Sequence, residues 1–163
     1  MDNNYSELSH RSLQGDSDIQ SMRNLIHSLP NGSSIVDFEE FIQIRSVQDA
    51  TRLWFSKGQL IAFAYVDDFC NLCFDLFPDR SSIQLESEIV AWGMQRLRER
   101  IQSTGEPATL DASCTGSNIE RIHFLERHGF IQQAIRSLHF ERDLSLPIPP
   151  VNIPAGYTIR TVK

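Results

Sequence analysis

The chain has few cysteines, no long apolar run and no basic cluster, and each shortage excludes a class of protein. Its 163 residues include three Cys, an odd number that does not suit a disulfide framework and fits a reducing compartment. No stretch approaches the roughly 20 apolar residues of a membrane span. The opening MDNNYSELSHRS lacks the basic start and apolar run of a secretory signal. We therefore expect a cytoplasmic protein without a membrane partner.

Positive charge is also scarce. The formal net charge is -6 and the pI is near 5.3, whereas binding to nucleic acid phosphates needs a basic patch. We expect no nucleic acid partner. The hydrophobic fraction of 40% and the ten Phe are enough for one sizeable core.

Cys70 and Cys73 have the C-x-x-C spacing of zinc and redox sites. A structural zinc usually needs four ligands, and Cys114 is the one remaining cysteine. A thioredoxin-like motif opens a helix, whereas FDLFPD follows here and is typical of a strand. We interpret the pair as reduced cysteines in a hairpin and predict no metal site.

The first half of the chain predicts a weak strand over 5–14, two helices and three strands. Pro30-Asn31-Gly32 ends the first helix. Its apolar face comprises Ile19, Met22, Ile26 and Leu29; that of the second comprises Phe38, Phe41 and Ile42. Capping-box spacing is found for Ser17 with Gln20 and for Asp37 with Glu40. The strands 51–56, 60–66 and 71–77 follow one another closely, which favours an antiparallel meander.

The second half alternates helices and strands. A long helix is predicted over 83–102, with Leu85, Ile89, Trp92, Leu97 and Ile101 as its apolar stripe. A short strand over 109–113 precedes a helix capped by Ser117 and Glu120 and ended by Gly129. One or two strands over 130–144 complete the order β-αα-βββ-α-β-α-ββ, an α/β class with a mixed sheet.

A proline-rich stretch follows. Residues 145–156, SLPIPPVNIPAG, contain four of the seven Pro and are typical of a stiff linker. The apolar and polar alternation over 157–163 then predicts the start of a second domain. The run from Tyr157 to Arg160 is similar to YSELSHRSL near the start of the chain. This similarity suggests that the second domain repeats the first, which we place at 1–144.

This order of elements, with Asn118 eleven residues before Gly129-Phe130, resembles the GNAT superfamily of N-acetyltransferases. The segment FERDLSLPIPPVNIPAGYTIR is similar to the junction of tandem GNAT proteins. The resemblance covers nearly the whole chain and implies the GNAT acyl-CoA N-acyltransferase fold, with acetyl-CoA as cofactor and a small-molecule or peptide amine as acceptor. It also implies a C-terminal GNAT domain as the partner of this one.

In that fold a glycine-rich first helical turn holds the cofactor pyrophosphate, because bare backbone and unpaired N–H groups approach it closely. The pantetheine arm pairs with the preceding strand, here 72–77. By resemblance, the cofactor-binding positions are Leu76, Phe77, Ser81, Ser82, Ile83, Gln84, Leu85, Glu86 and Asn118.

The loop departs from the family pattern. Ser81 stands where Arg is usual, and Gln84 and Glu86 stand where the two glycines belong; Ser81 with Gln84 has capping-box spacing. A carboxylate at ~6 Å from a phosphate, with an effective dielectric of ~20, costs roughly 3 kcal/mol, or about a hundredfold in affinity. Glu88 adds to the same negative potential. Acids are also common in first helical turns simply because they stabilise the helix dipole.

The usual acid is absent as well. Leu125 occupies the position at which many GNAT enzymes carry Tyr. His123, His128 and Asp75 are weak substitutes, so we assign no catalytic residue. The sequence thus predicts the N-terminal domain of an acetyltransferase, weak or inactive alone. Two alternatives remain: a non-catalytic GNAT-fold binding module, and a small effector-binding domain that holds an apolar or peptide-like ligand in the cleft.

Overall fold

The computed structural model describes residues 8–134, 143, 145–148, 150 and 152–160. The chain divides into two units, 1–132 and 133–163. The first contains β1 (Leu8–Ser12), α1 (Asp16–Ser28), α2 (Ile35–Phe41), α3 (Arg45–Asp49), β2 (Thr51–Ser56), β3 (Gln59–Val66), β4 (Leu72–Leu76), the short 3-10 helix η1 (Pro78–Arg80), α4 (Ile83–Thr104) and α5 (Ile119–Arg127). No described helix is long and apolar enough to cross a membrane.

The strands form one antiparallel sheet in the order β1-β2-β3-β4, which confirms the predicted meander. Lys57 and Gly58 both have positive φ angles, 51° and 77°, in the tight turn between β2 and β3. β3 is buried over almost its whole length because helices cover both faces of the sheet.

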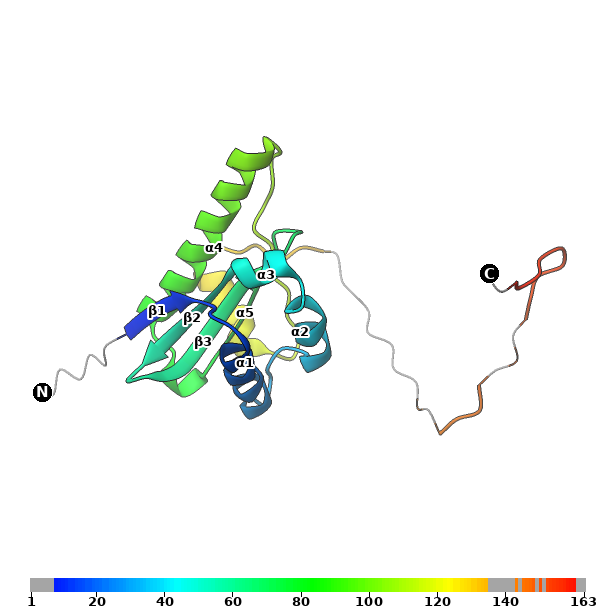
Figure 1. Ribbon diagram of the computed structural model, residues 1–163, viewed down its shortest axis with the longest axis horizontal. Helices are drawn as coiled ribbons and strands as arrows, with labels where there is room; N and C mark the ends of the chain where they lie inside the picture. Colours follow the sequence, from blue (N-terminus) through cyan, green and yellow to red (C-terminus); the bar gives the residue numbers. More distant parts are fainter. Residues whose placement is uncertain (1–7, 135–142, 144, 149, 151, 161–163) are drawn as a thin grey trace, which may run out of the picture. The chain divides into compact units, whose positions relative to one another are not determined.

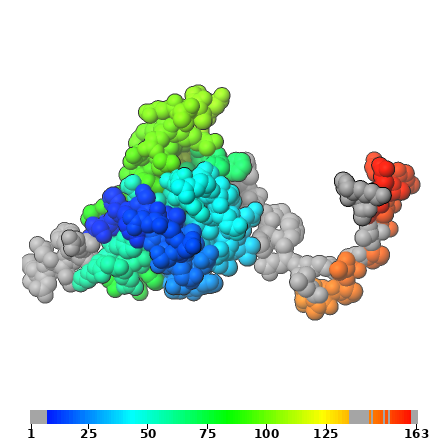
Figure 2. Space-filling view, viewed as in Figure 1, coloured from blue at the N-terminus to red at the C-terminus, as the bar shows by residue number. Residues whose placement is uncertain are grey.

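Alternating residues along each strand contribute to two cores. On one face α1 and α2 pack against Leu53, Leu60 and Phe63, and Figures 1 and 2 show these helices in front of the sheet. On the other face α4 and α5 pack against Trp54, Leu72 and Phe74 and lie behind the sheet in Figure 1. The apolar stripes predicted for α1 and α4 are the faces that these helices bury, except that Leu29 and Ile101 are only partly covered.

The helix starts differ from the predicted capping boxes, which were Ser17 with Gln20, Asp37 with Glu40, Ser81 with Gln84, and Ser117 with Glu120. The N-caps are Gly15, Ser34, Ser82 and Asn118, and the last three accept a backbone N–H through their side chains. Several overlapping spacings satisfy the capping pattern, and the chain path before each helix decides which residue stands just outside the first helical turn. Gly129, with φ at +83°, follows α5 as predicted.

The strand predicted over 109–113 is reduced to a single parallel bridge between Asn71 and Asp111. Leu72 N donates to Asp111 O over 2.7 Å, and Asp111 N donates to Cys70 O over 3.1 Å. Within the described residues the ladder goes no further, so β4 and this segment separate after one contact. That separation leaves the outer edge of β4 open toward α5. The five-residue helix α3 was not predicted.

Most of the predicted strands over 130–144 fall on 135–142 and 144, outside the described residues, and 130–134 contain no strand. Residues 145–148, 150 and 152–160 of the second unit form neither helix nor strand. Tyr157 N donates to Pro154 O over 3.1 Å in a turn. The domain boundaries at 144 and 156 stay predictions.

Candidate functional site

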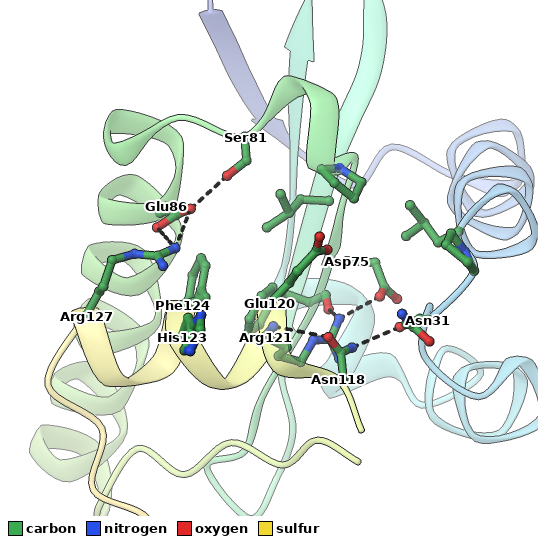
Figure 3. A pocket seen from close by; sticks show the side chains of 15 residues that line it. Asn31, Asp75, Ser81, Glu86, Asn118, Glu120, Arg121, His123, Phe124 and Arg127 are labelled. Atoms are coloured by element: carbon green, nitrogen blue, oxygen red, sulfur yellow. Dashed lines mark hydrogen bonds and ion pairs between the residues drawn. The ribbon is translucent and has the colours of Figure 1, made fainter. Parts of the chain in front are cut away.

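A cavity of about 290 Å³ lies where β4, the α1–α2 loop, the start of α4 and the inner face of α5 meet. The open edge of β4 forms its floor because the neighbouring segment has turned away. Figure 3 shows its polar side chains in two groups: Glu86 with Arg127 on one side, and Asp75 with Arg121 and Asn118 on the other.

Asp75, on β4, is fully buried. Its carboxylate accepts the Arg121 guanidinium at 2.7 Å and the Ser33 backbone N–H at 3.1 Å. Burial raises the pKa of Asp75, although Arg121 and Ser33 both oppose that shift. A carboxylate with these partners and no contact with solvent anchors the surrounding loops. It is not placed to act as the base that the sequence suggested.

Arg121 links α5 to the floor of the cavity. Its guanidinium also donates to the Phe74 carbonyl at the edge of β4 and lies 4.6 Å from the centre of the Phe74 ring. One side chain therefore satisfies the strand edge, pairs the buried Asp75 and covers an aromatic face. This carbonyl belongs to the strand at which the resemblance places the pantetheine arm.

Asn118 caps α5 by accepting Arg121 N–H at 3.1 Å. Its amide nitrogen donates to the Asn31 carbonyl at 3.2 Å, which ties α5 to the α1–α2 loop. Asn118 lines the cavity and both ends of its amide are engaged by the protein. Asn118 therefore has a structural role, and its cofactor-binding role stays a prediction.

Glu86, in the first turn of α4, is only 7% exposed. It accepts Ser81 Oγ–H at 2.8 Å and Arg127 at 3.0 Å, and His128 Nε2 lies 3.2 Å away. Burial would raise the pKa of Glu86, but these three partners outweigh it and hold the pKa below its ordinary value. The repulsion predicted from an isolated carboxylate is therefore overestimated, because Arg127 neutralises the charge.

The remaining predicted cofactor-binding residues separate into two groups. Leu76 and Ser81 line the cavity. Five others do not line it. Ser82 caps α4 and Gln84 donates to Glu88. Leu85 lies in the core beneath α4, Phe77 packs with the core on the other face of the sheet, and Ile83 is 77% exposed. The helix geometry still leaves the N–H groups of residues 83 and 84 without an intrahelical acceptor.

The candidates for acid–base chemistry are dispersed. Leu125, at the position where many GNAT enzymes carry Tyr, is buried and cannot donate a proton. Of the two histidines, His128 is engaged with Glu86 and His123 lines the cavity. Sequence reasoning missed Arg121 and Arg127, which organise both charged groups. Their partners lie 46 and 41 residues earlier in the chain, so no local pattern could have identified them. Among the described residues, no group of three or more metal-ligating side chains occurs.

The fold is that of the GNAT acetyltransferases. The chain is similar to the aminoglycoside N-acetyltransferase AAC(6')-Iy in complex with CoA, with a TM-score of 0.56 and 16% identity, covering 88% of this chain and 99% of that one. It is similar to Ard1 from Thermoplasma volcanium, with a TM-score of 0.56 and 14% identity, covering 78% and 84%. It is also similar to a transcriptional regulator from Bacillus halodurans C-125, with a TM-score of 0.59 and 12% identity, covering 83% and 100%. No protein-family model and no curated protein sequence matches the chain.

Proposed function

We propose that the chain is the N-terminal domain of an acetyl-CoA-dependent N-acetyltransferase that transfers an acetyl group to an amine, and that this domain is weak or inactive alone. The observation that carries the proposal is the meeting of the open β4 edge and the α4 N-terminus at one cavity. An open strand edge suits an amide-bearing arm, and a helix N-terminus suits a pyrophosphate. A cytoplasmic location is part of the same proposal.

The residues present fit acetyl-CoA poorly. Glu86 and its partners occupy the first turn of α4, where the family pattern has bare backbone. Arg121 already donates to the Phe74 carbonyl on β4. A bound cofactor would have to displace one or both groups, so we derive no chemical step at this site. We place the working centre in a C-terminal GNAT domain joined through the proline-rich linker.

The test is calorimetric titration of this chain with acetyl-CoA at low and moderate salt. We expect no saturable heat below millimolar cofactor. A variant carrying Ser81→Arg, Gln84→Gly and Glu86→Gly restores the family loop and should gain at least about tenfold in affinity. Saturable micromolar binding by the unaltered chain would show that the domain holds the cofactor by itself and would overturn its proposed weakness.

A second candidate is a non-catalytic GNAT-fold binding module. Arg121 favours it, because this side chain fills the strand edge and pairs Asp75 from within the domain. The double variant Asp75→Asn/Arg121→Gln removes both buried charges and opens that edge. If Arg121 is the obstacle, the double variant binds acetyl-CoA more tightly than the unaltered chain, whereas Arg100→Gln on the exposed end of α4 has no effect. Equal affinity in all three proteins would remove the support for this candidate.

A further inference from the structure

Arg52, on β2, is a partly buried arginine that has no carboxylate partner in the part of the chain that the structure describes. The other partly buried arginines of that part each pair with an acid: Arg11, Arg23, Arg96 and Arg121. The Arg52 guanidinium lies 5.8 Å from the centre of the Trp92 ring, and its Nε is buried without a hydrogen-bond partner among the described residues. Because charges removed from water are normally paired, Arg52 is open to a negatively charged partner.

Arg52 lies beside the free edge of the sheet. It pairs with Ser12 on β1, which is the edge strand at the opposite side of the sheet from β4 (Figure 1). The Leu13 N–H donates to the Thr51 carbonyl at 3.4 Å. The odd-numbered residues of this strand therefore direct their backbone groups toward β2, and the even-numbered residues direct theirs outward. Among the described residues β1 has no second neighbouring strand.

The side chains of these even-numbered residues lie on the face of the sheet that α4 covers, which is also the face of Arg52. The His10 ring packs edge-on against Trp54, with 6.4 Å between the ring centres, and Leu8 packs against the core beneath α4. Ser12 is small and exposed, so a long side chain can extend across it. This face of β1 contains no acid that could pair with Arg52.

The edge of β1 has little protection against further pairing. Exposed strand edges usually carry a lysine, a proline or a bulge that prevents it, whereas LSHRS has no Lys or Pro and pairs with β2 without a register shift. Arg11 is held on the opposite face, where it donates to Asp18 at 2.7 Å. Arg11 also donates to the Ser12 carbonyl at 3.2 Å. The outward groups that stay available include the Ser12 N–H and both backbone groups of His10.

We propose that the β1 edge binds an extended segment of a partner protein as a fifth strand, and that an acidic residue of this segment pairs with Arg52. Such a strand forms main-chain hydrogen bonds at His10 and Ser12, and every second side chain of it lies on the α4 face. A residue there stands two strand spacings, roughly 9.6 Å, from Arg52. An arginine and a glutamate together span that gap across Ser12 and form a charge-assisted pair. This surface is separate from the cavity at β4, so the inference does not rest on the proposed function.

A purely structural role for Arg52 predicts something different. A guanidinium over the Trp92 ring stabilises the fold by a cation–π contact. That contact alters the stability of the domain but gives no preference among peptides of different charge. Peptide charge therefore separates the two roles.

The experiment is an NMR titration of the ¹⁵N-labelled chain with three acetylated and amidated peptides, TVTETVT, TVTQTVT and TVTKTVT. We expect the glutamate peptide to shift the amide signals of His10 and Ser12 and the Nε–H signal of Arg52 in a saturable manner. The glutamine peptide should bind at least about threefold more weakly, and the lysine peptide more weakly still. Equal binding of the three peptides, no binding, or shifts confined to other surfaces would overturn the proposal.

Three variants assign the effect to Arg52 and to the strand edge. Arg52→Gln should remove the preference for the glutamate peptide over the glutamine peptide, whereas Arg98→Gln, which removes an exposed charge of α4, should keep it. His10→Pro removes one outward N–H without removing a hydrogen bond to β2 and should abolish the binding of all three peptides. A preference that persists in Arg52→Gln would refute the role of Arg52, and unchanged binding in His10→Pro would refute strand addition.

Sedimentation velocity distinguishes a second copy of the chain from a different partner. A dimer that His10→Pro dissociates and Arg52→Gln leaves intact would assign the edge to a second copy and overturn the proposal. We expect a monomer, because the α4 face of β1 in a second copy offers no acid to Arg52.

Discussion

Arg127 Nη2 lies 3.0 Å from one oxygen of Glu86 and 3.1 Å from the other, so one guanidinium nitrogen bridges both oxygens of a carboxylate 41 residues earlier in the chain. This contact connects the end of α5 to the first turn of α4. It also explains how an acid is accommodated where the related fold usually has glycine.

Glu86→Gln should destabilise the domain by about 1–2 kcal/mol, because the buried side chain loses its charge-assisted hydrogen bonds while the half-exposed Arg127 can turn to water. Urea denaturation measures the change. The matched control is Asp49→Asn, which removes the exposed Arg45–Asp49 pair and should cost less than about 0.5 kcal/mol. Equal losses in the two variants would show that the Glu86 group is not stabilising.

The stabilising effect of Glu86 should disappear in acid. Its folded pKa lies below the ordinary value of 4.5, so the unfolded chain takes up the proton first as the pH falls. Its contribution is therefore complete above the unfolded pKa and is lost as the pH falls through the folded pKa. The difference in unfolding free energy between the unaltered chain and Glu86→Gln should be largest at pH 7 and should shrink steadily as the pH falls below 4.5. A difference that grows on acidification would contradict this assignment.

Gly93→Ala in α4 should be destabilising although alanine is the better helix former. A Cβ at position 93 would lie 3.1 Å from side-chain carbons of both Leu72 and Leu110, so the core must shift at a cost of about 1–3 kcal/mol. Gly116→Ala is the control, since a Cβ there meets nothing within 4 Å. Thermal unfolding of both variants checks the prediction, and a Gly93→Ala protein as stable as Gly116→Ala would contradict it.

The three cysteines should react in a fixed order. Burial raises the pKa of the Cys73 thiol to about 11, Cys70 is buried and Cys114 is exposed. Because the thiolate is the reactive form, limiting iodoacetamide at neutral pH should modify Cys114 first. Peptide mapping by mass spectrometry gives the order. Modification of Cys73 as fast as Cys114 would contradict the raised pKa of the Cys73 thiol.

Local patterns in the sequence predicted most of the elements. An almost continuous apolar run over 60–66 predicted β3, alternation along 71–77 predicted β4, and three- and four-residue spacing predicted α1 and α4. These patterns succeed because each element buries one face, or both, against a shared core. The same patterns failed for 109–113. The pattern of a short segment does not show whether a neighbouring strand runs beside it, and here the pairing ends after one bridge.

The sequence alone determined the positions that differ from the family pattern: Ser81, Gln84, Glu86 and Leu125. The tertiary structure decided what those differences mean. It brought Arg127 to Glu86 and Arg121 to the β4 edge, so that an expected repulsion became a neutral pair and the Phe74 carbonyl of the open edge already has a donor. Contacts between residues more than 40 positions apart depend on how helices and strands pack. The spacing of residues within one helix or strand does not predict that packing.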